Sequence, residues 1–528
     1  MSDFLSSDGH KILLAFWMTL KVSALSAAGS LVLGTVLAAM RVAPLPVLRT
    51  VGTLYVNVLR TTPLTLIILF CGLGLGSIIT VADVQTTNYF WLAVIGLVAY
   101  TSAFVCEVLR SGVNTVPFGQ AEAARSIGLG FTQTLRIVVL PQAFRAVIAP
   151  LGSVLIALIK NTTIAAAIGV PEAFYTMRNQ LQNHGDIVIP IFVGYALFFV
   201  ALTLPVGLFF RLAGQAVGRG PVNEPTVLYD APGPRGRRRN GLLTVIFAVV
   251  FAAIAAWVVW ALGQKGQWAA QKWKPFLQGD IWTVQILPGL AGTLKAAAIA
   301  AVLALAFGIT FGLARLSGRW WIRGPAGTIV EFFRAIPLLL LIFFASYAPG
   351  ALTNFTWNPT ALQAVVFGLT MYNGSVLAEV VRAGINAIPK GQSEAGYAVG
   401  LRRGQLMRLI LVPQAITAMM PAIVSQLVVL LKDTALGTLI AYDNLTAKVS
   451  ILQNLYTNAI PAAIVIACIY IPLNLALPRP RPDWNGATGG AGSAPCPRLP
   501  TGSSWPSGHD GTRLTEPGGR NGRRLCGI

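Results

Sequence analysis

Long apolar runs constrain the fold of this chain more than any other feature. A helix needs about 20 apolar residues to cross the hydrocarbon of a bilayer, and eleven segments of the sequence meet that requirement. Only 11% of the residues are charged, whereas about a quarter of the residues of a soluble domain are charged. The sequence therefore predicts an all-α, polytopic membrane protein. The expected spans lie at about 12–40, 52–77, 88–109, 143–170, 187–210, 241–262, 285–314, 326–349, 361–381, 414–441 and 458–477.

Lysine and arginine are not spread evenly between these spans. The net charge is +21, but the basic residues gather beside apolar runs, where anionic lipid and the positive-inside rule account for them. We therefore expect no nucleic-acid partner, an N-terminus outside the cell and a C-terminus in the cytoplasm. One outer loop is an exception with three lysines, and its tryptophans predict a helix lying at the membrane surface. These residues are Lys265, Lys272, Lys274, Trp268 and Trp273.

One pattern occurs twice in the sequence. EVLRSGVNTVPFGQAEAA begins at Glu107, and EVVRAGINAIPKGQSEAG begins at Glu379, 272 residues later. LIKNTT from Leu158 and LLKDTA from Leu430 keep that offset, and LRTTP pairs with FRAIP at an offset of 274. Both polar loops carry positive charge on the same predicted side. We therefore expect two parallel repeats of about five transmembrane helices, related by a pseudo-twofold axis along the membrane normal, plus one extra helix.

Composition sets the boundaries of these repeats. We expect a first repeat at 1–216, a cytoplasmic linker rich in Pro, Gly and Arg at 217–240, an extra transmembrane helix at 241–263 and a second repeat at 264–477. Residues 478–528 are dense in Pro, Gly and Arg and cannot build a core, so we expect a disordered tail. Our hypothesis for its composition is an out-of-frame reading of GC-rich coding sequence.

A polar segment, AEAARSIGLGFTQTLRIVVLPQ at 121–142, separates two apolar runs. Good helix formers around Glu122 predict a short surface helix that Gly128 ends, and Pro141 is expected in the first turn of the next span. A single segment of this kind would be an ordinary amphipathic loop. Two of them, at a fixed spacing and on one side, suit the docking of a partner with twofold symmetry.

The repeated segment resembles the EAA signature of the permease subunits of ATP-binding-cassette (ABC) importers. The first copy continues to Leu140-Pro141 and the second to Val412-Pro413. The flanking pattern ExxRxGxxxxPxGQxEA is similar to that of the polar-amino-acid subfamily, and the resemblance covers residues 12 to about 477. The residues at the signature positions are Glu122, Ala123, Ala124, Gly128, Glu394, Ala395, Gly396 and Gly400.

This resemblance implies a fold like that of type I ABC importers, with two permease halves fused in one chain. It also implies that each EAA-type loop is a coupling helix docking on one of two separate nucleotide-binding ATPase subunits, which would hold ATP and Mg²⁺. An extracytoplasmic substrate-binding protein and the bacterial plasma membrane complete the expected setting. The resemblance is closest to paired glutamate-type permeases, so glutamate, aspartate or glutamine leads among the substrates.

Ionisable residues inside the apolar runs are candidates for a substrate path, because a charge in hydrocarbon is costly and tends to face a cavity or a partner. Arg60 and Arg334 each precede a proline that loosens the helix. A guanidinium at this place could bind a substrate carboxylate. Alternatively, it could lie near the cytoplasmic boundary and cap neighbouring carbonyls.

A second polar interruption also occurs once in each repeat. Residues of low helix propensity predict a broken helix whose carbonyls and hydroxyls line a water-filled path. Asn161 is neutral whereas Asp433 could meet a substrate ammonium, so one substrate could bind off the axis. The alternative is an ion pair, from Lys432 to Asp433 or between helices, that only fixes packing. The residues concerned are Lys160, Asn161, Thr162, Lys432, Asp433 and Thr434.

Two acid–base pairs have helical spacing. Glu107 with Arg110, and Glu379 with Arg382, are three residues apart, where side chains on a helix meet. Their place near the cytoplasmic face favours structural pairing or an inner gate over substrate contact. Two aromatic residues upstream, Tyr100 and Tyr372, could line the path or simply pack.

Motifs for catalysis and for metal binding are missing from the sequence. GxxxxGK[ST], HExxH and GxSxG do not occur, the three histidines are far apart, and the five cysteines form no CxxC pair. We therefore expect no catalytic residue, no metal site and no cofactor in this chain. The polar N-terminal residues lack a basic leader, so we also expect no cleaved signal peptide.

The sequence as a whole thus predicts the transmembrane permease of an ATP-driven importer for a polar amino acid. An ion-coupled secondary amino-acid transporter is the alternative, because it also uses repeats and broken helices. It does not require two matched cytoplasmic loops. A membrane-bound enzyme would need a cluster of His or acidic residues at one face, and the sequence offers none.

Overall fold

The computed structural model describes residues 2–78, 85–185, 187–216, 234–353 and 356–476, which are mostly helical and include no strand. Nine helices of this described part are long and apolar enough to cross a membrane, and two bent helix pairs bring the spans to eleven. These eleven segments fall where the apolar runs predict them, so the all-α, polytopic fold is confirmed. Residues 217–233 of the predicted linker and the predicted tail at 478–528 lie outside the described residues.

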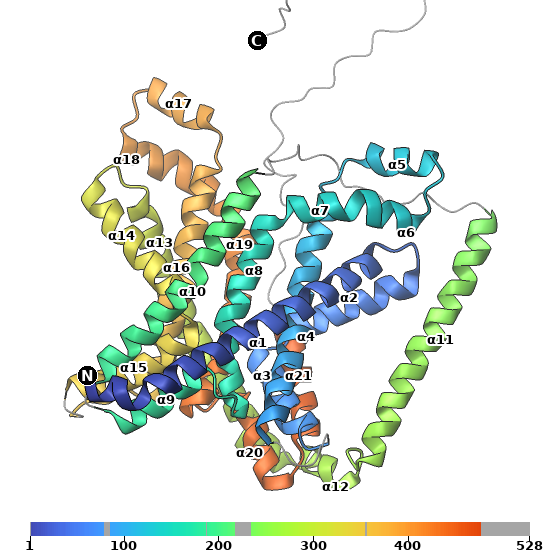
Figure 1. Ribbon diagram of the computed structural model, residues 1–528. Coiled ribbons are helices and arrows are strands. Elements are labelled where there is room, and N and C mark those ends of the chain that lie inside the picture. Colours follow the sequence, from blue (N-terminus) through green and yellow to red (C-terminus); the bar gives the residue numbers. More distant parts are fainter. Residues whose placement is uncertain (1, 79–84, 186, 217–233, 354–355, 477–528) are drawn as a thin grey trace, which may run out of the picture. The chain divides into compact units, whose positions relative to one another are not determined.

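The first repeat begins with α1, and its elements reach the end of α10 (Figure 1). Short 3₁₀ and π segments adjoin several of its α-helices. Its elements are α1 (Ser2–Val42), α2 (Pro46–Thr61), α3 (Leu64–Leu69), η1 (Phe70–Leu75), α4 (Gln85–Val113), α5 (Phe118–Ser126), α6 (Phe131–Gln133), η2 (Thr134–Val139), α7 (Leu140–Ala146), α8 (Ile148–Asn161), η3 (Thr162–Ile168), α9 (Ala173–Asn183) and α10 (Val188–Ala216).

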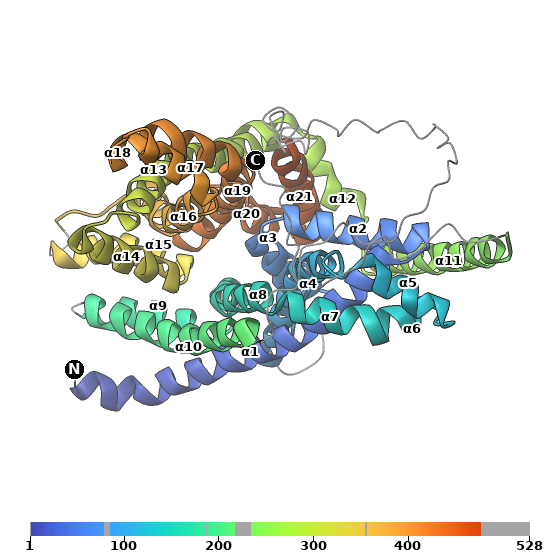
Figure 2. The ribbon, with the colours of Figure 1, turned by 90° about the horizontal axis from the view of Figure 1, so that it is seen from above.

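The second repeat follows the same order of elements. Seen from above, its helices α13, α16 and α19 gather in one group, while α1, α8 and α10 of the first repeat lie together in another (Figure 2). Its elements are η5 (Ile281–Ile286), α13 (Leu287–Arg315), α14 (Trp320–Ala335), α15 (Leu338–Leu352), α16 (Ala361–Asn386), α17 (Lys390–Ala398), α18 (Arg403–Leu406), η6 (Met407–Leu411), α19 (Val412–Asp433), η7 (Thr434–Ile440), α20 (Ala447–Tyr456) and α21 (Ala459–Ala476).

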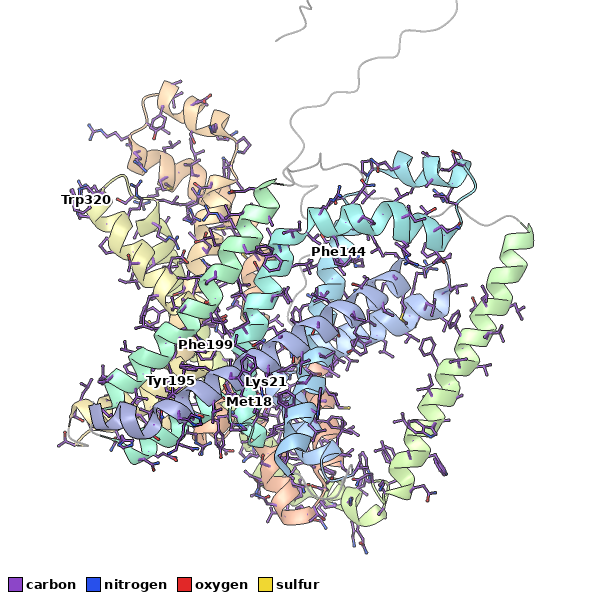
Figure 3. All side chains as sticks on the ribbon, in the orientation of Figure 1. Met18, Lys21, Phe144, Tyr195, Phe199 and Trp320 are labelled. Carbon is purple, nitrogen blue, oxygen red and sulfur yellow. The ribbon has the colours of Figure 1, made fainter. Side chains whose placement is uncertain are left out.

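Small residues let the long helices of each repeat pack closely. A Cβ atom added to Gly34 on α1 would lie 2.6 Å from Val105 of α4. At the matched place of the second repeat, a Cβ atom on Gly308 of α13 would lie 2.6 Å from Leu377 of α16. Both helix pairs therefore need glycine at the contact, as transmembrane helix interfaces often do. Aromatic packing adds to the first repeat, where Tyr195 and Phe199 of α10 lie over α1 (Figure 3).

The second span of each repeat is bent at a proline. α2 and α3 meet at an angle of 104°, and α14 and α15 meet at 101°. Thr62 and Ile336, at the two bends, have extended backbones, because a residue before proline is disfavoured in the helical region. The expected spans at 52–77 and 326–349 are therefore each two helices. The length of an apolar run does not reveal the angle between the two helices that it forms.

The helix α11 (Pro234–Gln264) follows the first repeat in sequence, begins inside the predicted linker and lies at the outer edge of the molecule (Figure 1). No residue of its most apolar stretch is buried, which suits a helix surrounded by lipid. It is followed by α12 (Ala270–Trp273) and the 3₁₀ segment η4 (Lys274–Leu277). Here the Trp268 and Trp273 rings stack with centroids 5.9 Å apart, in the loop where a surface helix is predicted.

Candidate functional site

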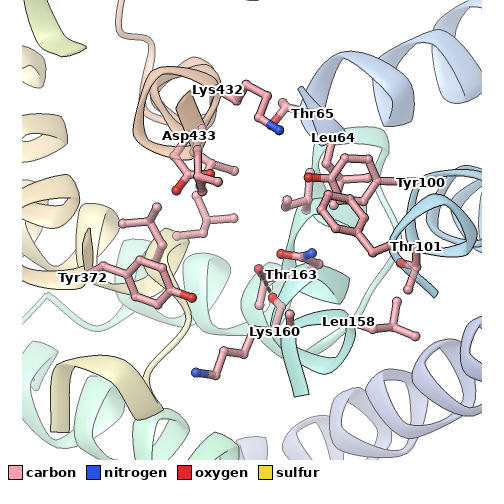
Figure 4. A pocket seen from close by; sticks show the side chains of 18 of the residues that line it. Leu64, Thr65, Tyr100, Thr101, Leu158, Lys160, Thr163, Tyr372, Lys432 and Asp433 are labelled. Atoms are coloured by element: carbon pink, nitrogen blue, oxygen red, sulfur yellow. Dashed lines mark hydrogen bonds between the residues drawn. The ribbon is translucent and has the colours of Figure 1, made fainter. Parts of the chain in front are cut away.

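A cavity of about 210 Å³ lies where the two repeats meet, and matched residues of both repeats line it (Figure 4). Its walls come from the broken spans α3 and α15, from α4 and α16, and from the ends of α8 and α19. Pairs at the repeat offsets face it from both repeats, so the cavity lies on the pseudo-twofold axis. These pairs are Leu64 and Leu338, Tyr100 and Tyr372, Lys160 and Lys432, and Asn161 and Asp433.

Two lysines connect the repeats reciprocally at this cavity. The Lys432 Nζ atom donates a hydrogen bond to the Arg60 carbonyl at 2.6 Å, and the Lys160 Nζ atom donates to the Arg334 carbonyl. Both carbonyls lie in the last turn before a bend, where a helix leaves carbonyls without intrahelical partners. The bend in one repeat thus creates the acceptor for the lysine of the other.

The predicted helix breaks lie directly after these lysines. α8 gives way to the 3₁₀ segment η3 at Thr162, and α19 gives way to η7 at Thr434. Both threonine hydroxyls are buried and donate to carbonyls of their own helices, Ile159 for Thr162 and Leu431 for Thr434. Thr163, rather than Thr162, lines the cavity. The threonine hydroxyls thus stabilise the change of helix type.

The cavity is asymmetric in charge at one matched position. Asp433 of the second repeat stands where the first repeat has Asn161, and both line the cavity. Within the part of the chain that the structure describes, no basic group forms an ion pair with Asp433; in particular, Lys432 does not. The ion pair that sequence reasoning left open is therefore not formed, and a carboxylate faces the cavity from one repeat only.

Each repeat also holds one glutamate among three arginines beside its bend. In the first repeat, Glu107 pairs with Arg60 at 3.3 Å, Arg110 at 3.1 Å and Arg41. The expected Glu107–Arg110 contact is thus confirmed. Since Arg60 bonds Glu107 with its guanidinium and Lys432 with its carbonyl, it links the cluster to the cavity.

The second repeat reproduces this cluster and adds an acid. Glu379 pairs with Arg315 at 2.9 Å, Arg334 at 3.7 Å and Arg382. Glu331 also lies 3.0 Å from Arg315 and 3.6 Å from Arg334. The guanidiniums of Arg60 and Arg334 are thus paired with acids, and neither lines the central cavity.

Sequence reasoning missed two members of these clusters. Arg41 and Arg315 belong to the basic residues beside the apolar runs, from which only the orientation of the chain is predicted. They lie 274 residues apart, the same offset as Arg60 and Arg334. That offset was the available signal. The acid Glu331 has no such signal, because Asn57 occupies the matched position of the first repeat.

The two EAA-type segments form short helices, α5 and α17, which lie at the same end of the helices in Figure 1. In α5, Glu122 and Ala123 are exposed and Ala124 is buried; in α17, Glu394 and Ala395 are exposed and Gly396 is buried. The third signature position therefore packs inward in both copies, and the first two face outward.

Glycine ends both short helices in a left-handed conformation. Gly128 has φ +89° and Gly400 has φ +79°, a region that side chains disfavour. The next residue donates back across the turn in each copy, Leu129 to the Ala124 carbonyl and Leu401 to the Gly396 carbonyl, both at 3.1 Å. This is a Schellman-type cap, and it explains why the sequence needs glycine at both places.

Exposed apolar side chains surround these caps at matched positions. Ile127 is 78% exposed and Val399 is 75% exposed. Ile137 and Leu409 are each 62% exposed. Large exposed apolar side chains thus lie at or beside the two short helices, at the same places in both repeats.

At the opposite end of the helices, a buried carboxylate begins α9. Glu172 is fully buried and accepts hydrogen bonds from the Phe174 and Tyr175 amides, both at 2.9 Å. Burial raises the pKa of the Glu172 carboxyl from 4.5 to about 8, against the opposing effect of these two bonds. Asn444 stands at the matched place before α20 and accepts from the Ala447 amide at 2.9 Å.

Chemically, the arrangement can hold polar groups but offers little for catalysis. Among the described residues, no group of three or more His, Cys, Asp or Glu side chains could hold a metal ion. Lysine ammoniums, one carboxylate and tyrosine hydroxyls line a small cavity between the two repeats. Such groups can bind a zwitterion and release it.

Fold and cavity together define a polytopic membrane protein made of two like repeats around a cavity that a few charged and polar side chains line. Residues 30–219 and 304–479 match the family described as binding-protein-dependent transport system inner membrane component. The chain belongs to this family and carries its domain twice, so the recognition made from the EAA-type segments is confirmed. The family is a membrane component of transport systems rather than a catalytic enzyme.

Individual relatives resemble one half of the chain at a time. The glutamate transport system permease protein GluC of Corynebacterium efficiens is 52% identical over 215 residues, covering 39% of this chain and 94% of the relative. GluD of Corynebacterium glutamicum is 45% identical over 216 residues, covering 41% of this chain and 79% of the relative. A probable glutamine ABC transporter permease protein, GlnM of Bacillus subtilis, is 35% identical over 193 residues, covering 37% and 87%.

Proposed function

We propose that this chain is the fused, two-repeat membrane subunit of an ATP-driven importer for a polar amino acid, with glutamate, aspartate or glutamine as the substrate. The observation that carries the proposal is the pair of matched helices, α5 and α17, at one end of two like bundles. Relatives named for glutamate and glutamine transport support the substrate class. The chain would lie in the bacterial plasma membrane with its N-terminus outside and its C-terminus in the cytoplasm.

Two separate ATPase subunits would dock on α5 and α17. Glu122, Ala123, Glu394 and Ala395 face outward for this contact, and the exposed apolar residues beside the caps would be covered by it. Ala124 and Gly396 pack inward and hold each helix to its bundle. Gly128 and Gly400 would fix the turns at the ends of α5 and α17, so that each helix is presented to its ATPase subunit. ATP and Mg²⁺ would be bound by the partner subunits, and a substrate-binding protein would deliver the amino acid from outside.

Movement of the docked loops would open the cavity by separating the two repeats. Each lysine ammonium is held by a carbonyl of the opposite repeat. When the repeats move apart, Lys160 and Lys432 lose these acceptors and become available to a substrate carboxylate. Asp433 would then receive the substrate ammonium, whereas Asn161 could only hydrogen-bond to it.

The remaining members of the predicted path would act indirectly. Arg60 and Arg334 would support the lysines, because each guanidinium is fixed by a glutamate and each carbonyl accepts a lysine bond. Thr162 and Thr434 would hold the helix breaks through their bonds to helix carbonyls. One substrate at a time, bound off the axis, follows from the single carboxylate.

Uptake by reconstituted vesicles tests this function. Vesicles would contain the full chain, its ATPase subunit and the binding protein, with ATP on the ATPase side and labelled glutamate on the other. We expect uptake that needs ATP and persists after ionophores collapse the ion gradients. Uptake that stops with the gradients while ATP remains would instead indicate an ion-coupled transporter. Competition by aspartate, glutamine and arginine would rank the substrates.

A further inference from the structure

A second cavity lies between α7, α8 and α10, apart from the central one, and has a volume of about 980 Å³. Two arginines line it, Arg145 from α7 and Arg211 from α10, and none of the acidic residues that the structure describes does. Its remaining walls are mostly apolar or small, with Phe210 and Ile156 among them. The cavity therefore has two guanidinium groups on its wall, and the rest of the wall is largely apolar.

Both arginines are exposed and have no acidic partner. Arg145 and Arg211 form no ion pair within the described ranges of the chain. In the two clusters beside the bends, by contrast, every arginine pairs with a glutamate. Two guanidiniums in one cavity repel each other unless an anion lies between them, so the cavity is suited to a negatively charged group.

The depth of these arginines matches that of lipid headgroups. Arg211 lies in the last turns of the span Val188–Gln215, and Arg145 lies just before the span Ile148–Ile168. Both therefore stand at the place where the chain crosses from hydrocarbon to water, on the side of α7 and α5 (Figure 1). Basic pockets between transmembrane helices at this level bind anionic lipid headgroups.

An apolar surface leads from this cavity along α10. A neighbouring cavity of about 910 Å³ shares Ser153, Ile156 and Arg211 with it. Leu204 and Leu208 of α10 line this neighbouring cavity, and so do Lys160, Glu331 and Arg334, of which Glu331 and Arg334 pair with each other. Leu204 is 62% exposed and Leu208 is 56% exposed. A molecule bound at the arginines could thus lay an apolar chain against α10, which a soluble phosphate could not do.

The second repeat lacks this arrangement. Thr417 stands at the position that matches Arg145, whereas Ser425 matches Ser153 and is likewise exposed. The Asn474 side chain of α21 donates to the Thr61 carbonyl at 2.7 Å and so fixes α21 against the bend of α2. The cavity with paired arginines is therefore a property of the first repeat.

We propose that the cavity between α7, α8 and α10 binds one anionic phospholipid, with its phosphate between Arg145 and Arg211 and its acyl chains along Leu204 and Leu208. Guanidinium groups bind phosphate oxygens in bidentate geometry. A lipid at this place joins α7, which follows the docking segment α5, to the outer surface of α10. It stabilises the junction between the first repeat and its docking loop.

Lipid retention by the full chain tests the proposal. The chain would be purified from vesicles that contain equal parts of phosphatidylglycerol and phosphatidylcholine, and the lipid retained would be measured by native mass spectrometry. We expect preferential retention of phosphatidylglycerol. Each arginine near a membrane surface contributes a factor of about 5, so Arg145→Thr with Arg211→Gln should lower retention about 30-fold. Arg323→Thr, an exposed arginine outside the cavity, should leave it unchanged.

Three results would overturn the proposal. Equal retention of phosphatidylcholine would show that charge does not select the lipid. Equal losses of phosphatidylglycerol in the double variant and in Arg323→Thr would show that retention depends on the net charge of the protein and not on this cavity. Displacement of the lipid by millimolar inorganic phosphate would mean that the acyl chains contribute nothing. Arg145→Thr introduces the residue that the second repeat already carries, so folding should be preserved, and the thermal midpoint would check it.

Photo-crosslinking gives a second, position-resolved readout. A photoreactive residue at Ser153 should capture phosphatidylglycerol, and the same residue at the matched Ser425 should capture several-fold less. Equal capture at the two positions would show unspecific lipid contact and contradict the proposal. Loss of capture at Ser153 when the ATPase subunits are bound would show that the partner, rather than lipid, covers this cavity.

Discussion

The two repeats share a backbone plan but differ in charge at the places where they meet. Lysines, bends, the short helices α5 and α17 and their glycine caps occur in both at matched positions. Three other charged side chains have no charged counterpart: Asp433 stands against Asn161, Glu331 against Asn57, and Arg145 against Thr417. The two repeats therefore share the residues that shape and position their helices. The differences place a carboxylate on one side only of the central cavity, which two identical subunits could not do.

The largest expected effect concerns the carboxylate of the central cavity. Asp433→Asn makes both repeats alike at this position and removes the group proposed to receive the substrate ammonium. Uptake should fall about 100-fold, corresponding to about 3 kcal/mol for a charged hydrogen bond. Asn161→Ala at the matched position should cost less than about 5-fold in the same vesicle assay. Equal losses at the two positions would contradict an off-axis substrate.

The second effect compares the two arginine clusters. Among the residues that the structure describes, Glu107 is the only acid paired with Arg41, Arg60 and Arg110. Glu107→Gln should therefore destabilise the protein by about 2 kcal/mol, allowing for solvent screening of the arginines. Glu379→Gln should cost about 1 kcal/mol, because Glu331 still pairs with two arginines there.

Denaturation by sodium dodecyl sulfate in detergent micelles would measure this difference. The midpoint should fall more for Glu107→Gln than for Glu379→Gln. Glu331→Gln combined with Glu379→Gln should then match the loss seen in the first repeat. If the two single variants behaved alike, Glu331 would have no supporting role.

A third, smaller effect concerns the third signature position of the docking helices. Gly396 packs against Leu406, and a methyl group at Gly396 would collide with the Leu406 Cδ1 atom. The first repeat has Ala124 at this position and Thr134 at the place that matches Leu406. Gly396→Ala should therefore cost about 1 kcal/mol from overpacking.

Adding Leu406→Thr to Gly396→Ala recreates the pair of the first repeat and tests the explanation. In a double-mutant cycle of thermal unfolding, the two changes should be coupled favourably by about 1 kcal/mol. Additive costs would mean that the size of the neighbouring side chain does not determine the choice between alanine and glycine.

The smallest effect is a pH dependence confined to the first repeat. Because the pKa of Glu172 is raised from 4.5 to about 8 by burial, the folded protein binds this proton more tightly than the unfolded chain. The thermal midpoint should therefore rise as the pH falls from about 8 towards 4.5. Glu172→Gln should reduce that rise. If the difference in thermal midpoint between the wild type and Glu172→Gln did not change over this range, the pKa of Glu172 would not be raised by folding, and this account would be contradicted.

Much of the fold follows from sequence because lipid demands long apolar helices. The eleven spans and the helix breaks after Asn161 and Asp433 are visible in residue types alone. The angles at Pro63 and Pro337 are not, because proline weakens a helix without fixing its direction. The terminating role of Gly128 and Gly400 was predictable, since few residues adopt a positive φ.

The site was only partly predictable for a related reason. Polar residues of the cavity could be found as interruptions of apolar runs, and four of the eight predicted path residues line it, namely Lys160, Asn161, Lys432 and Asp433. Their partners could not, because Lys432 meets a backbone carbonyl 372 residues away in sequence. Backbone acceptors leave no trace in residue identity, and they exist here only because the helix bends.

The number of ATPase subunits bound by one chain tests the central claim most directly. Native mass spectrometry of the purified complex should show two ATPase subunits for the wild type and one for either Gly128→Asp or Gly400→Asp. The combined variant should bind none and support no uptake, while its membrane insertion and thermal midpoint stay close to those of the wild type. Two bound subunits in the folded double variant would contradict the assignment of α5 and α17 as the docking helices.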